Sequence, residues 1–435
     1  MLKFAVPELT EADPVVAGEG SLDPLGLGPI GDRLAELLLP GITNRMRRPR
    51  FLTAMAVGAI ATEGLEWLAP ADGRSTPSIC FEWLLLEAFE RRRRLGIAPD
   101  ELQGVPGSAK VAVAIAKGER LSLGNYLKTA NVFGFTGVLM PLARSTHLLD
   151  RDRRAAERAA DLVSIWQLEQ KRDGFVEGAR STDGGKFRRA INEGARQSLL
   201  AGRCEVKPGS SLFGDLAQTL RPSGAGDAER TWLSRALLDP SDETRQEIGL
   251  LVQAAPSDLG DRGLVELIRP KASAVLGQRL DAVIAYEAVA RRLESVLDEW
   301  QFRSTLWRSK PVTAGDVAKS EVVAVAAASL SDAIAAGRDA IAKVAPLLAA
   351  DFDRLAAAFE GRIGQVALAE AVMEHHEQIQ GAKPPNGKRS WFEPVDSGFV
   401  VRNLYRREEE PSGSFDRFNR QYRLAAFRNM LQELM

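Results

Sequence analysis

Apolar side chains recur at steps of three and four residues along most of this chain, and that spacing constrains the fold more than any other feature. Ala, Leu, Arg and Glu, which favour helices, dominate the same stretches. The pattern predicts helices over 280–302, 317–345 and 351–378, whereas 399–404 is the best candidate for a strand. We therefore predict a mostly α fold, a multi-helix bundle with minor β structure near the C-terminus.

Clusters of Gly, Pro and Ser interrupt the helical pattern and divide the 435 residues into five segments. Residues 1–28 form an acidic N-terminal segment that is rich in Gly and Pro. Two helical domains are expected over 29–175 and 231–380, with a loop-rich connector over 176–230 between them. The chain then ends in a basic loop and an amphipathic helix over 381–435.

Charge is balanced over the whole chain but not locally. Lys and Arg number 57 against 58 Asp and Glu, a net charge of −1, which excludes a uniformly basic nucleic-acid binder. Residues 310–381 hold six basic and ten acidic side chains (6 − 10 = −4), and residues 383–428 hold ten and six (10 − 6 = +4). This change of sign predicts a local surface that faces an anion.

The number of cysteines and the hydropathy of the sequence indicate in which cellular compartment the protein is expected. Cys80 and Cys204 are the only cysteines in the sequence, too few for a disulfide framework or a Cys-rich zinc site. The first residues lack the apolar core of a signal peptide, and no run of about 18 uncharged apolar residues predicts a membrane span. We expect a cytoplasmic protein that does not enter a membrane.

Common cofactor and metal signatures are missing from the sequence. It has no GxxxxGK[ST] loop, no GxGxxG turn that follows a strand and no GxSxG elbow. His375 and His376 are adjacent, so they point to different faces of a helix and are not placed to bind one metal ion together. We expect neither a metal nor a cofactor.

Four arginines follow a predicted helix in the segment 22–51. Pro29 suits the first turn of this helix, and Asp32 is expected in the same turn, near the positive dipole end. After a stop at Gly41, the guanidinium groups of four residues crowd the start of a second helix: Arg45, Arg47, Arg48 and Arg50. They are candidates for a phosphate clamp. The alternative is a solvated arginine face paired with nearby carboxylates.

A carboxylate lies in an apolar stretch of the predicted helix 78–94. Glu82 sits beside Trp83, where burial would raise its pKa and suit it to acid or base chemistry. The alternative is a structural partner for an arginine. The four arginines that end this helix suit its negative dipole end, with phosphate contact as the other interpretation.

Three short helices are predicted over 108–117, 122–133 and 136–147. Short helices joined by tight turns are typical of a helix-turn-helix, which would make this N-terminal part helix-turn-helix-like. Any small helical bundle has a similar pattern. In the first interpretation a DNA groove would face Asn125, Tyr126, Lys128 and Thr129.

Cations and aromatics share the Pro- and Gly-rich loop that follows the histidine pair. Lys383, Lys388 and Arg389 precede Trp391 and Phe392. This combination suits phosphate contact with stacking on an unpaired base. The alternative is a core tryptophan below a basic loop.

The segment 22–51 resembles an uncharacterised helical family of bacterial phage-defence islands. Its opening block pairs an acidic residue with Leu-Gly-x-Gly, then an aspartate, Pro-Gly and spaced arginines; here these are Asp23, Leu25, Gly26, Gly28, Asp32, Pro40, Gly41, Arg45 and Arg48. Two further segments look similar, through His376, Gly387, Lys388 and Trp391 and through Tyr422 and Arg423. The resemblance covers both ends, about half of the chain, and departs at Ile42 and Asn44, where the family is rich in threonine.

The resemblance implies action on phage DNA, with residues 29–175 as a DNA-binding domain. A monofunctional DNA glycosylase that excises a modified base, such as a sugar-bearing cytosine, needs a backbone clamp, a pocket for the extruded base and a carboxylate. The expected carboxylates are, in order, Asp32, Asp23 and Glu82. Phosphates would be held by Arg45, Arg48, Lys388 and Arg389, and bases would stack on Trp391 and Tyr126. The alternatives are a non-catalytic DNA-binding subunit and a structural interaction protein.

Overall fold

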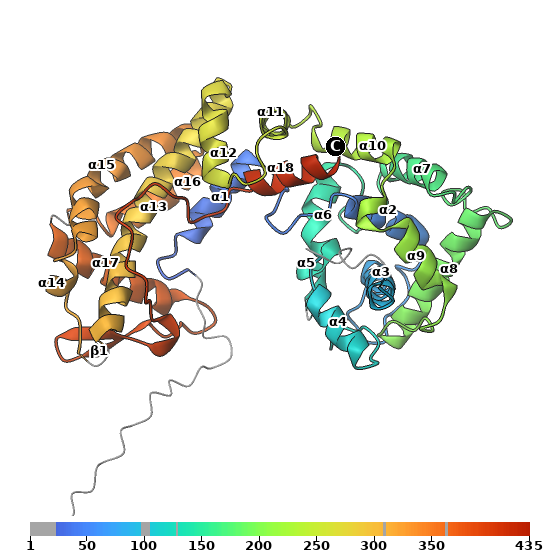
Figure 1. The fold of residues 1–435 in the computed structure, drawn as a ribbon, viewed down its shortest axis with the longest axis horizontal. Coiled ribbons are helices and arrows are strands. Elements are labelled where there is room, and N and C mark those ends of the chain that lie inside the picture. Colours follow the sequence, from blue (N-terminus) through green and yellow to red (C-terminus); the bar gives the residue numbers. More distant parts are fainter. Residues whose placement is uncertain (1–22, 97–104, 128, 308–309, 362–363) are drawn as a thin grey trace, which may run out of the picture. The chain divides into compact units, whose positions relative to one another are not determined.

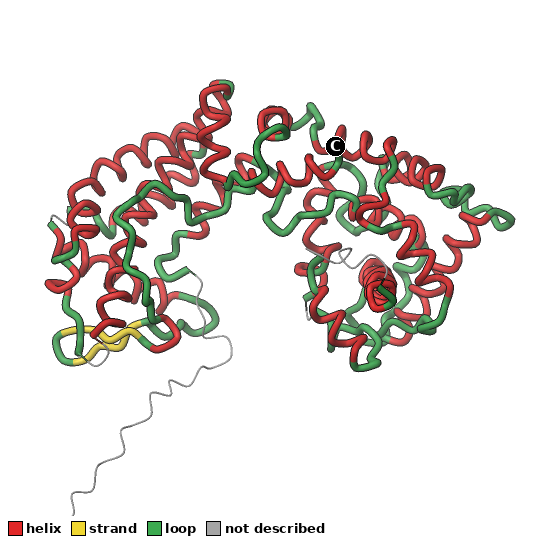
Figure 2. Tube along the Cα trace, in the orientation of Figure 1, coloured by secondary structure: helices red, strands yellow, loops and turns green. Residues whose placement is uncertain are grey.

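The structure of this chain is a computed structural model that describes residues 23–96, 105–127, 129–307, 310–361 and 364–435. Helices dominate these residues (Figures 1 and 2). Apart from isolated bridges, β structure in the described ranges is one antiparallel hairpin of β1 (Phe392–Val395) and β2 (Gly398–Val401). The prediction of a mostly α fold with minor β structure near the C-terminus is confirmed.

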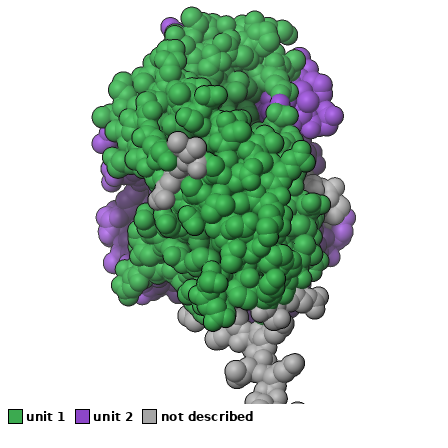
Figure 3. Space-filling model, turned by 90° about the vertical axis from the view of Figure 1, so that its left-hand side faces the viewer, with its two compact units in different colours: residues 1–38, 265–422 green, residues 39–264, 423–435 purple. Residues whose placement is uncertain are grey.

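The chain forms two compact units, which Figure 3 colours separately. Unit 1 consists of the residues up to Leu38 and Val265–Tyr422, and unit 2 consists of Leu39–Leu264 and Arg423–Met435. These units do not follow the five expected segments, because breaks in a helical pattern do not reveal which distant segments pack together. The expected loop-rich connector 176–230 holds two full helices, described below as α8 and α9.

Unit 2 is built around α3 (Pro77–Arg94), which Figure 1 shows end-on among its neighbours. Thr76 caps this helix through its hydroxyl, and Pro77 occupies the first turn. Every residue from Ile79 to Glu90 is buried, as expected for a helix with neighbours on all sides. Those neighbours are α2 (Phe51–Ala61), α4 (Ser108–Ala116), α6 (Phe135–Ser145), α8 (Asp183–Ala201) and α9 (Ser211–Thr219).

The remaining helices of unit 2 are short. They are α5 (Ala130–Phe133), α7 (Ala159–Glu169), η1 (Pro222–Gly224), α10 (Asp227–Leu237), α11 (Glu243–Val252) and α18 (Leu424–Glu433), while α12 (Asp261–Ile268) crosses the boundary between the units. The helices expected at 108–117 and 136–147 are α4 and α6, but the one expected at 122–133 is reduced to the four residues of α5. Ser122 instead forms a bridge with Arg203, so the helix-turn-helix-like arrangement lacks its middle helix.

Unit 1 is organised by α13 (Ala274–Trp307), which runs beside α15 (Glu321–Val344) (Figure 1). Its other elements are α1 (Gly28–Leu38), η2 (Arg269–Lys271), α14 (Ala314–Val317), α16 (Pro346–Ala357) and α17 (Gln365–Ala382). The helix expected over 351–378 is interrupted between α16 and α17. Gly361 and Gly364 adopt positive φ angles of 74° and 91° there, a conformation that a helix cannot include.

The β hairpin follows the basic loop after α17. Phe392 pairs with Val401, and the Phe392 ring packs edge-on against Trp300 of α13, with 6.4 Å between ring centroids. The strand expected over 399–404 ends at Val401, after which the chain enters η3 (Asn403–Tyr405). The expected final amphipathic helix is α18.

Candidate active site

Asp23 begins a loop that leads into α1 and caps that helix. Its Oδ1 accepts a hydrogen bond from the Leu27 backbone N–H at 2.9 Å, and its Oδ2 accepts one from the Gly28 N–H at 2.8 Å. A Cβ on Gly28 would lie 2.9 Å from that Oδ2, so only glycine leaves room for the carboxylate. The Asp23 side chain thus caps the start of α1.

Side chains of α17 bind the carbonyls of this loop. The Pro24 carbonyl oxygen lies 3.0 Å from His376 Nδ1 and accepts a hydrogen bond from Gln380 Nε2, also at 3.0 Å. The Leu25 carbonyl oxygen lies 3.0 Å from His375 Nε2. The two histidines therefore hold the backbone of a loop that precedes them by about 350 residues in the sequence.

Two further side chains bind the ends of the same loop. Lys383 Nζ donates to the Asp23 carbonyl, and the Tyr286 hydroxyl donates to the Leu27 carbonyl. Of the five residues from Asp23 to Leu27, four are thus fixed through their carbonyl oxygens. Gly26, the exception, has a positive φ of 66°, which glycine tolerates without strain. We call this arrangement the carbonyl clamp.

The protonation state of His376 follows from its partners. A carbonyl only accepts, so Nδ1 carries the hydrogen that goes to Pro24, and Nε2 accepts from the Trp391 backbone N–H at 3.1 Å. The ring is therefore neutral. Burial lowers the pKa of His376 to about 4 and also lowers the pKa of His375.

Asp32 lies on α1, one turn beyond Gly28, and not in the first turn as expected. Its side chain is exposed and makes no hydrogen bond or ion pair with the rest of the described chain. Residues four apart on a helix share a face, with Cβ positions about 5–6 Å apart. Because the Asp23 carboxylate lies against the Cβ position of Gly28, both carboxylates face the same side of α1.

Trp391 is half-buried beside the clamp. Its ring stacks on Tyr405, with 4.5 Å between centroids and 6° between planes, and it makes a T-shaped contact with the His376 ring, with 5.7 Å between centroids. The indole Nε1 is buried without a hydrogen-bond partner among the described residues. One face of the ring is thus covered, which leaves both the stacking and the core interpretation of Trp391 open.

The cations of this loop differ in exposure. Lys388 is half-buried and its backbone N–H donates to the Gln380 carbonyl at 2.7 Å, whereas Arg389 is exposed and pairs with Glu393. Lys383 is half-buried, and that burial lowers its pKa. Lys388 and Arg389, which are predicted to hold phosphates, therefore lie next to the carbonyl clamp at the surface of unit 1.

A third segment joins the same place from near the end of the chain. Arg420 packs against Gly31 of α1 and pairs with Glu287, with 3.1 Å between Nη1 and Oε1. The Tyr422 hydroxyl donates to Glu287 at 2.7 Å, and burial raises the pKa of Glu287. Parts of all three segments that carry the resemblance thus meet in unit 1, around the start of α1. The remaining residues of these segments belong to unit 2: Pro40, Gly41, Arg45, Arg48 and Arg423.

Glu82 belongs to unit 2 and is fully buried on α3. Its carboxylate accepts from the Tyr126 hydroxyl at 2.5 Å and from the Thr136 N–H at 3.0 Å, and burial raises its pKa. It caps α6, whose own N-cap residue Gly134 has no side chain. Since solvent reaches neither Glu82 nor the Tyr126 ring, this geometry favours a structural role for Glu82, but with Tyr126 and Thr136 as its partners in place of the expected arginine. Tyr126 is not placed to stack on a base.

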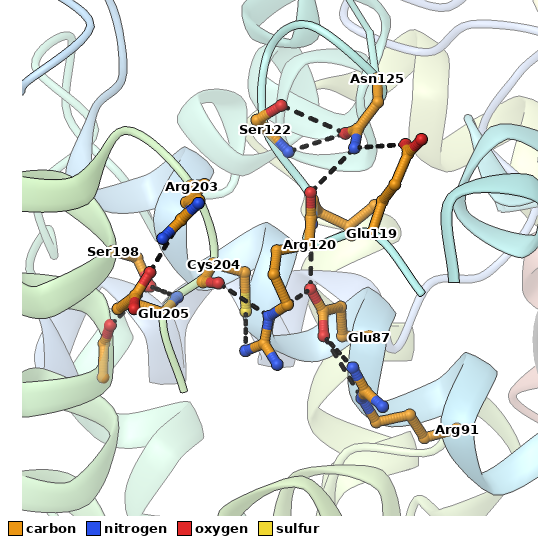
Figure 4. Close-up of polar contacts among 12 residues, drawn as sticks. Glu87, Arg91, Glu119, Arg120, Ser122, Asn125, Ser198, Arg203, Cys204 and Glu205 are labelled. Atoms are coloured by element: carbon orange, nitrogen blue, oxygen red, sulfur yellow. Dashed lines mark hydrogen bonds and ion pairs between the residues drawn. The ribbon is translucent and has the colours of Figure 1, made fainter. Parts of the chain in front are cut away.

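The other buried glutamates of α3 are paired with arginines. Figure 4 shows Glu87 between Arg91 and Arg120. Glu87 pairs with Arg91 at 2.8 Å and with Arg120 at 3.8 Å, and the Arg120 Nε donates to the Cys204 carbonyl at 2.9 Å. Glu90 pairs with two arginines at the end of the helix, Arg93 and Arg94. These contacts tie α3 to two loops and account for most of the basic helix end without a ligand.

The arginine cluster divides into buried and exposed members. Arg50 is buried against Glu229, with Nε–Oε1 and Nη2–Oε2 distances of 2.9 and 3.0 Å, so its guanidinium group does not face solvent as the predicted DNA contact requires. Arg48 is half-buried and pairs with Glu433 at 3.3 Å. Arg45 and Arg47 are exposed, as the predicted phosphate clamp requires. Lys128 lies outside the described residues.

Two pockets lie apart from the predicted site residues. One, of about 1090 Å³, lies between α8 and α9 in unit 2 and is lined by Phe187, Val206 and Leu212. The other, of about 380 Å³, lies in unit 1 on the face of α17 that carries Glu370 and Glu377. Within the described ranges, no three His, Cys, Asp or Glu side chains are grouped to hold a metal ion.

The sequence-based site is thus split between the units. Asp23, Asp32 and Trp391 lie in unit 1, while Glu82 and the arginine cluster lie in unit 2. Sequence reasoning missed the carbonyl clamp; its one signal was the set of donors at 375, 376, 380 and 383, which lie within nine residues of one another in the sequence. Comparison with protein families, curated proteins and solved structures gave no match. Among the described helices, none is both long and apolar enough to span a bilayer.

Proposed function

We propose that this chain is a monofunctional DNA glycosylase of phage defence, which excises a modified base, such as a sugar-bearing cytosine, and leaves an abasic site. The observation that supports this most is the carbonyl clamp. It fixes a loop whose carboxylate, Asp23, lies on the same face of α1 as the unpartnered, exposed carboxylate of Asp32. Such fixation is what a catalytic constellation needs, because small displacements cost large factors in rate.

The two carboxylates suit different parts of N-glycosidic hydrolysis. The bond between the base nitrogen and C1′ breaks, its electron pair leaves with the base, and positive charge develops on the sugar. Asp23, held by two backbone N–H groups, is a fixed negative charge that stabilises this state. Asp32 accepts a proton from the water whose oxygen then bonds to C1′, and the departing base takes a proton from solvent.

Both units offer cations for the DNA backbone. Arg45 and Arg47 are exposed in unit 2, and Lys388 and Arg389 accompany Trp391 in unit 1. Guanidinium and ammonium groups bind phosphate through charge and hydrogen bonds, without reading the sequence. This distribution is compatible with a protein whose net charge is close to zero.

The test is the formation of alkali-labile sites by the purified full chain. We expect such sites in phage DNA that carries glucosylated cytosine and none in unmodified DNA of the same sequence. Asp32→Asn keeps the shape of the side chain and removes its charge, so it should slow their formation by about 100-fold or more. Glu36→Gln is the matched control, since it removes a charge one turn further along the same face of α1 and should leave the rate unchanged.

A non-catalytic DNA-binding subunit is the second candidate, favoured by the exposed arginines of unit 2, which do not depend on the carboxylates. It predicts DNA binding by the parent protein without alkali-labile sites on any modified DNA. That outcome would overturn the glycosylase proposal.

A further inference from the structure

The helix α5 ends with two exposed apolar residues, beside two exposed cations. Val132 is 57% exposed and Phe133 is 44% exposed. The Arg45 guanidinium carbon lies 5.0 Å from the centroid of the Phe133 ring, and Arg47 is two residues away from Arg45 in the same loop. An aromatic ring held at the surface under a guanidinium group is a recurrent element of single-strand nucleic-acid binding.

The loop that carries the arginines is anchored by apolar side chains. Ile42 and Met46 are buried, and Met46 lies between Arg45 and Arg47 in the sequence. With Met46 directed into the core, its two neighbours are left at the surface. The cations are therefore held in place by packing, and charge pairing within the protein is not needed to position them.

The backbone that follows Phe133 is also held in place. Gly134 follows Phe133 directly, and a side chain on this glycine would collide with the Glu82 carboxylate and with the Ala130 carbonyl. Glu82 holds the start of α6 through the Thr136 N–H. The junction between α5 and α6 is thus packed onto a buried polar anchor, which leaves Phe133 at the surface.

We propose that Phe133, Arg45 and Arg47 form a binding platform for an unpaired nucleotide of single-stranded DNA. The base stacks on the Arg45–Phe133 pair, since guanidinium planes and aromatic rings both stack on bases, and Arg47 binds a neighbouring phosphate. Paired bases hide their faces inside the duplex, so the platform prefers single strands. The proposal deepens the DNA-acting function proposed above, and names a surface that is separate from the carboxylates of unit 1.

The test is the affinity of the full chain for a labelled, unmodified 12-nucleotide single strand and for the duplex of the same sequence, measured by fluorescence anisotropy at low salt. Loss of a base stack weakens binding about 5- to 150-fold. We expect Phe133→Ala and Phe133→Leu to weaken single-strand binding by at least about fivefold, with less than about a twofold change for the duplex. Phe133→Tyr keeps the ring and should bind like the parent.

Leu168→Ala is the control, because Leu168 is 67% exposed on α7 of the same unit and belongs to no proposed site. Parental single-strand affinity in Phe133→Leu, equal losses for strand and duplex, or competition by a polyglutamate peptide as effective as that by DNA would each overturn the platform. Alkali-labile sites do not enter this measurement, so a failed glycosylase assay and a failed platform remain distinguishable.

Discussion

The acidic and basic halves of the segment 22–51 are neighbours in the sequence but are held in opposite ways. The acidic half belongs to unit 1, where side-chain donors bind its backbone carbonyls and fix Asp23. The basic half belongs to unit 2, where buried apolar side chains anchor a loop that exposes Arg45 and Arg47. Proximity in sequence between a carboxylate and a row of cations is therefore no guide to a common site. The acidic half fixes the carboxylate of Asp23, whereas the basic half exposes the guanidinium groups of Arg45 and Arg47.

This difference has a physical consequence. The clamp depends on hydrogen bonds of a neutral histidine, so its strength varies with pH. Apolar anchoring does not depend on protonation, so the arginine loop keeps its shape over the same range. Mutations and pH changes should thus separate the two halves.

The largest effect on stability is expected from Arg50, the buried arginine of the basic half. Arg50→Ala leaves Glu229 buried without its partner, which should lower the free energy of unfolding by about 3–5 kcal/mol. Arg47→Ala, at an exposed position three residues earlier, should stay within about 0.5 kcal/mol of the parent. Urea unfolding of the three proteins measures both values. Equal stabilities for the two variants would show that Arg50 is not held as described.

Acidification should weaken the clamp. The folded pKa of His376, about 4, lies below its ordinary value of 6.5, so its contribution to stability is fully present above pH 6.5 and is lost as the pH falls towards 4. From the shift, the loss is about 2 kcal/mol between pH 7.5 and pH 5. Glu82, with its raised pKa, titrates in the opposite sense, so the comparison is with His376→Gln, which cannot titrate at this position.

Urea unfolding at pH 7.5 and pH 5 gives the difference between parent and His376→Gln. The parent should lose more stability than the variant on acidification. If Gln at this position does not support folding, His376→Asn, whose amide can still donate towards Pro24, replaces it in the comparison. Equal losses in parent and variant would contradict the neutral, buried state of His376.

Trp391 decides whether the basic loop beside the clamp contacts DNA. Trp391→Ala should weaken DNA binding by roughly 1–3 kcal/mol if a base stacks on the exposed part of the ring. If Trp391 only packs on Tyr405, the variant should lose thermal stability and show no selective binding defect. A melting curve measured beside a binding isotherm separates these results.

The smallest effect concerns salt. Affinity for duplex DNA should fall with salt at a slope of about −0.9 per phosphate contact. Replacing Arg45 and Arg47 together by Ala should flatten that slope by up to about two units, because each removes at most one contact. Binding isotherms at several salt concentrations provide the slope. A slope that the double variant leaves unchanged would remove this loop from the interface.

Helix periodicity was sufficient for the fold class because it depends on residues three and four apart. It could not predict the burial of a side chain whose partner is distant in the sequence. Arg50 is buried by Glu229, which is 179 residues away, and Tyr126 is buried by Glu82, 44 residues away. Nothing in the local pattern distinguishes a buried arginine in such a pair from an exposed one.

Local motifs single out the residues of the candidate site but carry no information about its geometry. Asp23, Asp32 and Trp391 stood out from local motifs, and the structure places all three in unit 1. The clamp could not be foreseen, because it joins His375 to a carbonyl 350 residues away and uses the backbone of Pro24 and Leu25, whose side chains carry no signal.

The most direct measurement is the single-turnover excision rate at saturating modified DNA, determined with the DNA affinity for the parent, Asp32→Asn and the double variant Arg45→Ala/Arg47→Ala. If the acidic half performs the chemistry and the basic half binds, Asp32→Asn should excise at least about 100-fold more slowly with parental affinity. The arginine variant should bind more weakly and excise at the parental rate once saturated. Parental excision by Asp32→Asn, or no abasic sites from the parent protein, would contradict this division.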